Sequence, residues 1–61
     1  MPKKSSYNQR ISATFDAIKE CQIFYFGGNT FVKKRNNGAS NAFNLDTGEP
    51  HYFYADTVVE Y

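Results

Sequence analysis

The sequence predicts a small, mainly β domain, and two observations support this fold class. Aromatic and β-branched residues at 22–26 and 30–34 flank a Gly-Gly-Asn break at 27–29, which is typical of a β-hairpin whose turn needs positive φ angles. Further short segments rich in alternating or β-branched residues follow, separated by clusters of turn residues, at 41–45, 51–55 and 57–61. We therefore expect a five-stranded antiparallel meander.

A short helix is predicted before the first strand. Ile11, Phe15 and Ile18 recur at helical spacing, which favours a helix over about 13–20 with one apolar face. A helix of this length is marginal alone, so it should cover the sheet. Because a small five-stranded sheet curls and so limits its exposed edges, we expect a small α+β fold, an SH3-like barrel or half-barrel.

Period-two alternation divides the large apolar residues between two faces of the predicted sheet. The predicted core is Phe15, Ile18, Phe24, Phe26, Phe31, Phe43, Leu45, Phe53 and Val58. The other face receives Ile23, Tyr25, Val32, Tyr52, Tyr54, Val59 and Tyr61. One small core cannot bury both sets, so we expect a partly exposed face rich in tyrosine, of the kind that binds proteins or stacks on bases.

The domain organisation follows from length and charge. Sixty-one residues allow one domain, and we expect a flexible basic arm at 1–10 followed by a single β domain at 11–61. Residues 1–35 hold seven basic and two acidic side chains, a balance of +5, whereas residues 36–61 hold four acidic and no basic ones. The charge is therefore separated along the chain, which can orient a partner or promote self-association.

Enzymatic chemistry has little support in the sequence. Cys21 is the only cysteine and His51 the only histidine, so neither a disulfide nor a zinc site with four N or S ligands can form within the chain. We expect Cys21 to be a small buried residue at the end of the helix and His51 an exposed structural one. A domain this small should also lack a cleft of the size that surrounds a substrate. We expect no enzyme, no catalytic residues, no metal and no cofactor.

No apolar run is long enough for a signal peptide or a membrane span, since the longest, Ile23–Phe26, has four residues. The single unpaired cysteine favours a reducing compartment. We therefore expect a soluble cytoplasmic protein without a membrane partner, as a monomer or a weak homo-oligomer.

A pattern of aromatic, glycine and charged residues runs through most of the chain. It comprises Phe24, Gly27-Gly28, Phe31-Val32-Lys33, Ala42, Gly48, Phe53, Asp56 and Val58. This pattern resembles short proteins encoded by tailed bacteriophages and covers about residues 15–60. Glu20-Cys21-Gln22 stands where such proteins often have a glycine that opens the first strand. The resemblance implies a small curled β domain and a phage origin, and hence the cytoplasm of an infected cell, but no functional residue.

Very small phage proteins without a catalytic constellation commonly act by binding. We therefore expect a non-enzymatic accessory module that contacts a host protein of unknown identity through its exposed aromatic face. The residues predicted to form this contact are Tyr25, Val32, Tyr52 and Tyr54.

Single-stranded nucleic acid is the alternative partner. Cations that track the backbone and aromatic rings that stack on bases form such sites. The cations assigned to this role are Lys33, Lys34 and Arg35 at the hairpin end with Lys3, Lys4 and Arg10 of the arm. Against it, the isoelectric point of about 7.9 is below that of dedicated nucleic-acid binders. The basic run also alternates between two strand faces, and it equally suits a solvated, edge-protecting role.

Overall fold

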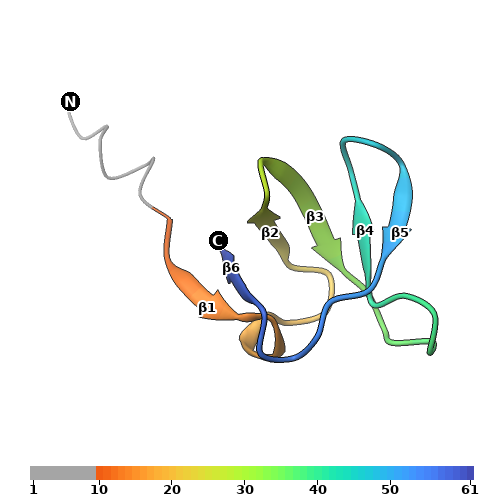
Figure 1. The fold of residues 1–61 in the computed structure, drawn as a ribbon, viewed down its shortest axis with the longest axis horizontal. Helices are drawn as coiled ribbons and strands as arrows, with labels where there is room; N and C mark the ends of the chain where they lie inside the picture. Colours follow the sequence, from red (N-terminus) through yellow and green to blue (C-terminus); the bar gives the residue numbers. More distant parts are fainter. Residues whose placement is uncertain (1–9) are drawn as a thin grey trace.

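A computed structural model describes residues 10–61, so the predicted arm lies outside the described residues except for Arg10. These residues form one antiparallel sheet in the spatial order β1-β6-β2-β3-β4-β5 (Figure 1). The strands are β1 (Ser12–Thr14), β2 (Ile23–Phe26), β3 (Asn29–Lys33), β4 (Ala42–Asn44), β5 (Glu49–His51) and β6 (Val58–Glu60). A mainly β fold is therefore confirmed, with six strands in place of the predicted five.

The predicted hairpin is confirmed as β2–β3, and it lies at the centre of the sheet. Phe24 pairs with Phe31 and Phe26 pairs with Asn29. This register leaves only Gly27 and Gly28 in the turn, with φ angles of 59° and 83°. Two successive positive φ angles are what a type I′ turn requires, and this turn matches the natural twist of a hairpin. Glycine reaches both conformations without steric cost, so the turn follows directly from the local sequence.

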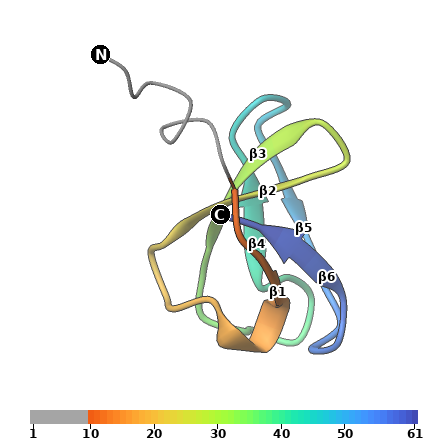
Figure 2. The ribbon, with the colours of Figure 1, turned by 90° about the vertical axis from the view of Figure 1, so that its left-hand side faces the viewer.

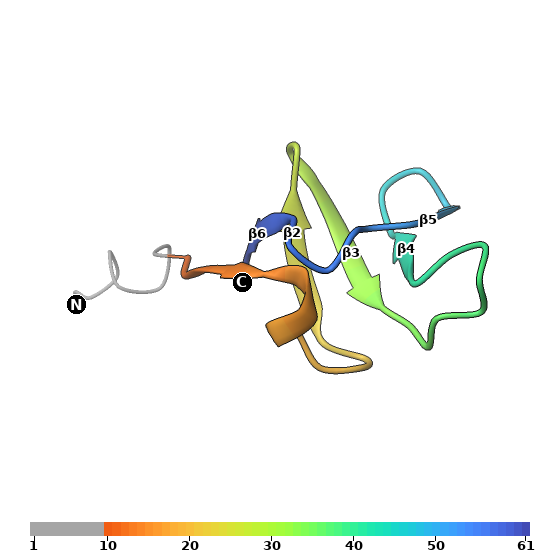
Figure 3. The same cartoon turned by 60° about the horizontal axis from the view of Figure 1, so that its bottom comes forward.

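The predicted helix over 13–20 is wrong. The chain forms strand β1, then the single 3₁₀ turn η1 (Phe15–Ala17), as Figure 3 shows. Ile11 and Tyr61 exchange two backbone hydrogen bonds, of 2.8 and 2.9 Å, so the start of this segment is held in the sheet by β6 (Figure 2). Thr14 makes no side-chain capping bond to the turn. A short uncapped helix is less stable than strand pairing here, because it forms few hydrogen bonds for the number of residues that it orders.

The sheet does not close into a barrel. Strands β1 and β5 are its two edges and do not pair with each other. The segment that follows β5 runs back toward β6 across the curved sheet (Figure 1). The buried side chain of Asn41 accepts a hydrogen bond from Phe53 N and donates one to Phe53 O, both of 2.8 Å. The Asn41 side chain therefore holds the irregular segment around Phe53 in place. Closing the barrel would need a pair of strands at this position instead.

Phenylalanine rings form the core, with Phe53 at its centre. Its ring centroid lies 5.2 Å from that of Phe15, 5.3 Å from Phe24 and 5.0 Å from Phe31. Offset-stacked and edge-to-face pairs at these separations add to the stabilisation from burial alone. The buried apolar residues are Phe15, Ile18, Phe24, Phe31, Ala42, Phe53 and Val59. Five of the nine predicted core residues are in this set.

The last strand has the opposite register from the prediction. Val59 is buried and pairs with Ala13, whereas Val58 is 60% exposed. Because side chains alternate along a strand, an error of one residue exchanges the two faces. The sequence places two valines side by side, and only the pairing with β1 decides which of them faces the core.

Strand β4 also differs from the prediction. Phe43 is half-buried on the outer face, and Leu45 lies beyond the strand and is 48% exposed. Ala42 and Asn44 face inward instead, because they pair with Lys33 and Phe31. Asn44 is buried because its side-chain oxygen accepts hydrogen bonds from two backbone N–H groups of the next turn.

Phe26 is the remaining difference in the core. It was predicted to be buried, but it is 40% exposed at the hairpin end. Its ring still packs edge-to-face on Phe53 at 5.2 Å, so it lies at the rim of the core on the predicted face.

Candidate functional site

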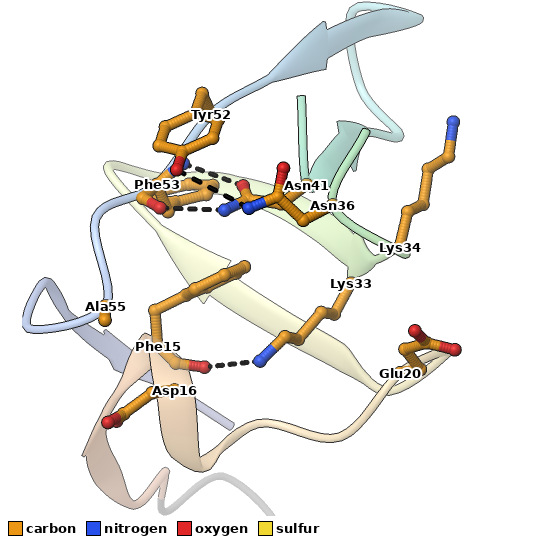
Figure 4. A pocket seen from close by; sticks show the side chains of 10 residues that line it. All are labelled: Phe15, Asp16, Glu20, Lys33, Lys34, Asn36, Asn41, Tyr52, Phe53 and Ala55. Atoms are coloured by element: carbon orange, nitrogen blue, oxygen red, sulfur yellow. Dashed lines mark hydrogen bonds between the residues drawn. The ribbon is translucent and has the colours of Figure 1, made fainter. Parts of the chain in front are cut away.

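An open cavity of about 400 Å³ lies on the inner side of the sheet. It is lined by Phe15, Asp16, Glu20, Lys33, Lys34, Asn36, Asn41, Tyr52, Phe53 and Ala55 (Figure 4). These residues come from the 3₁₀ turn, the connection into β2, the end of β3, the loop before β4 and the segment after β5. The volume is within the range of small-ligand sites. The prediction that this domain lacks such a cleft is therefore wrong.

Tyr52 and Tyr54 lie on the segment after β5, on either side of the buried Phe53. Tyr52 lines the cavity and Tyr54 is 73% exposed. Their rings pack edge-to-face with centroids 5.8 Å apart. Period-two alternation in this extended segment buries the middle residue and exposes its neighbours. The structure therefore brings these two predicted contact residues together.

Asn36 lies beside Tyr52 at the same end of the cavity (Figure 4). Its amide nitrogen lies 3.5 Å from the Tyr52 hydroxyl, the longest separation that still counts as a hydrogen bond. The amide oxygen of Asn36 accepts a hydrogen bond of 2.7 Å from Gly38 N, and that of Asn37 accepts from Ser40 N at 2.8 Å. These turns fix the loop that carries Asn36. Asn36 was not among the residues assigned to either predicted contact site.

Lys33 is held by the backbone of the 3₁₀ turn. Its ammonium group donates hydrogen bonds of 3.0 Å to Phe15 O and 2.6 Å to Ile18 O. It also lies 4.3 Å from the centroid of the Phe15 ring. Phe15 O also accepts a backbone bond from Ile18 N, whereas the Ile18 carbonyl, at the end of the turn, takes its hydrogen bond from the lysine of the facing strand. The geometry gives Lys33 a structural position at the cavity wall.

The other described cations point in different directions. The Lys34 ammonium lies 5.6 Å from the ring centroid of Phe43 on the outer face. Arg35 and Glu20 form a long ion pair of 3.9 Å in which both side chains are exposed. Such a pair contributes little to stability. The basic run is thus divided between the two faces of the strand, as its alternation predicted.

Arg10 lies at the hairpin end of the sheet. Its guanidinium carbon is 3.8 Å from the ring centroid of Tyr25, a distance that gives a cation–π contact. Arg10 therefore does not join Lys34 and Arg35, and Lys3 and Lys4 lie outside the described residues.

Tyr25 and Val32 lie on the outer face of the sheet, away from the cavity. Val32 pairs with Ile23 on one side and Phe43 on the other, and Phe43 pairs with Pro50. Cross-strand partners point to the same face, so these residues form an apolar row across four strands. The four residues predicted to form one contact face therefore belong to two separate surfaces, and Phe43 was missed because it was assigned to the core.

The titratable residues considered for catalysis are placed apart from the cavity. His51 is exposed, as predicted, with its ring 4.3 Å from that of Phe53. Cys21 is exposed and has a φ of 70°, which corrects the prediction that it is buried. It lies in a tight connection into β2, not at the end of a helix. Within residues 10–61, no three His, Cys, Asp or Glu side chains gather closely enough to hold a metal ion.

Comparisons with protein-family models, with curated proteins and with solved structures give no match to this chain. The resemblance to phage proteins therefore stays a prediction. None of the helical structure in residues 10–61 is long and apolar enough to cross a membrane.

Proposed function

We propose that this protein is a non-enzymatic binding module that holds a segment of another protein in the cavity beside Tyr52. The observation that carries the proposal is the exposed Tyr52–Tyr54 pair at an open cavity with aromatic walls. Tyrosine supplies a large contact area and a polar end at a low cost in side-chain entropy, which suits it to binding surfaces. We also propose that the protein is encoded by a phage and that its partner is a host protein.

The lining of the cavity indicates the chemistry of the bound segment. Phe15 and Phe53 form an apolar wall, and the acidic residues Asp16 and Glu20 also line the cavity. We expect an extended segment with an apolar side chain next to a basic one. An SH3-like half-barrel is part of this proposal by analogy of fold, since domains of that kind bind extended proline-rich segments in aromatic-lined grooves.

Recovery of a partner from a nuclease-treated bacterial lysate tests the proposal, with the tagged protein as bait. The double variant Tyr52→Ser, Tyr54→Ser should lose a stoichiometric partner that the original chain retains. Both side chains are exposed, so the fold should survive. The matched control is Ile23→Ser with Tyr25→Ser on the outer face, which should keep the partner. The reverse result would place the contact on the outer face and contradict the proposal.

Single-stranded nucleic acid is the second candidate, and one observation favours it. Lys34 lines the cavity together with Asn36 and Tyr52, although its ammonium group turns toward Phe43, so a cation can reach a ligand that contacts the amide and the stacking ring. The affinity for a labelled oligothymidine should fall steeply as the salt concentration rises, because the release of counterions from the nucleic acid then contributes less to binding. Lys34→Gln with Arg35→Gln should abolish it, whereas Lys33 is left unchanged because it holds the turn. Absence of binding at low salt would rule out this candidate.

A further inference from the structure

The loop between β3 and β4 contains the one asparagine of the chain that is followed by glycine, Asn37-Gly38 (Figure 1). An asparagine side chain in this context reacts with its own backbone, because glycine has no side chain to hinder the approach to its nitrogen. Asn37 and Gly38 are both exposed, so water and hydroxide reach them. The pair is therefore a candidate site of spontaneous chemical modification.

The reaction open to this pair is deamidation. Gly38 N loses its proton and attacks Cγ of Asn37, so an N–Cγ bond forms while the Cγ–Nδ2 bond breaks and ammonia leaves. Water then opens the cyclic succinimide at either of its carbonyl groups and leaves aspartate or isoaspartate at position 37. Water is the sole co-reactant, and no atom is oxidised or reduced.

The folded loop holds both reacting groups in hydrogen bonds. The nucleophile, Gly38 N, donates its hydrogen to Oδ1 of Asn36 at 2.7 Å. The amide that it must attack is also held, since Oδ1 of Asn37 accepts from Ala39 N at 2.9 Å and from Ser40 N at 2.8 Å. Removal of the Gly38 proton must first break the bond to Asn36, and the reacting atoms must then reach an attacking geometry. The loop in this conformation therefore slows the reaction.

The other described asparagines are less suited to the reaction. Asn29, Asn36, Asn41 and Asn44 each precede a residue whose side chain hinders the attack. Asn41 and Asn44 are in addition buried, with their side-chain oxygens engaged by backbone N–H groups. The reactivity is thus concentrated at Asn37.

We propose that Asn37 is a deamidation site of this protein and that the Asn36 side chain slows the reaction while the loop is folded. Asn36 is a positioning residue, since it holds the Gly38 N–H, and it also lies beside Tyr52 at the cavity. Aspartate at position 37 adds a negative charge but still accepts the two backbone bonds, whereas isoaspartate lengthens the backbone and disrupts them. Either product changes the loop at the edge of the cavity. The proposal is independent of what the cavity binds.

Mass spectrometry of protein kept at mildly alkaline pH tests the site. Conversion of the amide to a carboxyl group raises the mass, and labelling by an isoaspartyl methyltransferase detects isoaspartate. Trypsin cleaves after Arg35, the last basic residue of the chain, so fragmentation of the peptide 36–61 locates the change. We expect it at Asn37, and Asn37→Asp should show no gain of mass in this peptide. A faster change at any other asparagine would overturn the proposal.

The role of Asn36 is measured as the ratio of the deamidation rate in the folded chain to that in guanidinium chloride. This ratio removes the effect of a substitution on the intrinsic reactivity of the sequence. The original chain should react more slowly when folded. Asn36→Ala removes the acceptor and should raise the ratio roughly 2–10-fold, the rate equivalent of one hydrogen bond.

Asn36→Asp is the matched control, because its carboxylate accepts from the same N–H and should keep the ratio low. Circular dichroism melting of both variants checks that the sheet stays folded during the measurement. The proposal is overturned if Asn36→Ala has the same ratio as the original chain, if Asn36→Asp reacts as fast as Asn36→Ala when folded, or if folding does not slow the original chain.

Discussion

Replacing Lys33 with methionine tests whether this lysine has a structural role or a ligand-binding role. The ammonium group donates to Phe15 O and Ile18 O, so the change removes two charge-assisted hydrogen bonds. Methionine retains an unbranched stem of similar length, so packing against the Phe15 ring is largely kept. The loss therefore reports mainly on the hydrogen bonds between β3 and the 3₁₀ turn.

The size of the effect follows from those bonds. A hydrogen bond to a charged group contributes about 1.5–3 kcal/mol. Phe15 O keeps the bond of 3.0 Å from Ile18 N, so mainly the Ile18 carbonyl loses its partner. Water reaches this half-buried position and offsets part of the loss. We expect the free energy of unfolding to fall by about 2 kcal/mol, which lowers the melting temperature of so small a domain by about 8–16 °C.

Thermal and urea unfolding followed by circular dichroism measure this change. Lys34→Met is the matched control, since the Lys34 ammonium only lies near the Phe43 ring, and its stability should change by less than about 0.5 kcal/mol. Equal stability of the two variants would refute a structural role for Lys33. It would also return Lys33 to the group of candidate ligand-binding cations.

Three further substitutions test the fold by the same unfolding measurements. Phe53→Ala should cost about 3–5 kcal/mol, because it empties the centre of the ring cluster, and a loss below about 1 kcal/mol would contradict that central position. Asn41→Leu should cost about 2–4 kcal/mol, because it leaves Phe53 N and Phe53 O without partners, and near-equal stability would show that water replaces the amide. Cys21→Gly should raise the free energy of unfolding by about 0.5–1 kcal/mol, because it relieves a φ of 70° that is unfavourable for any residue other than glycine, and this gain exceeds the entropy cost of glycine. A lower free energy of unfolding would contradict strain at this position.

Local sequence predicted the features that depend on local geometry. The hairpin was predicted correctly because two adjacent glycines and the flanking aromatic residues specify turn and strands together. Cys21 lies in the connection into β2 and has a φ of 70°. The connection into β2 therefore takes a conformation that glycine prefers.

The errors arose where distant segments decide the structure. The helical spacing of Phe15 and Ile18 arises from one tight turn that buries both side chains, with Ile18 N donating to Phe15 O at 3.0 Å. Pairing of β1 with β6 across most of the chain was not visible in either segment alone. The same pairing decides that Val59 and not Val58 enters the core.

The candidate site was predicted in part for the same reason. An excess of aromatic residues over core positions predicted that some tyrosines stay exposed, and Tyr52 and Tyr54 do. Their neighbours in the cavity, Phe15 and Asn36, come from elements distant in sequence, so no local pattern could group them. Alternation alone predicted that Lys33 and Lys34 take opposite faces, but not that Lys33 meets the carbonyls of a turn.

Backbone amide shifts on titration test most directly that binding occurs at the tyrosine-lined cavity. The measurement uses ¹⁵N-labelled protein and the partner recovered from the lysate, followed by two-dimensional NMR. We expect the largest shifts at Asn36, Tyr52 and Tyr54, with small ones along the outer row at Ile23 and Val32. Shifts confined to the outer row would contradict the proposed site.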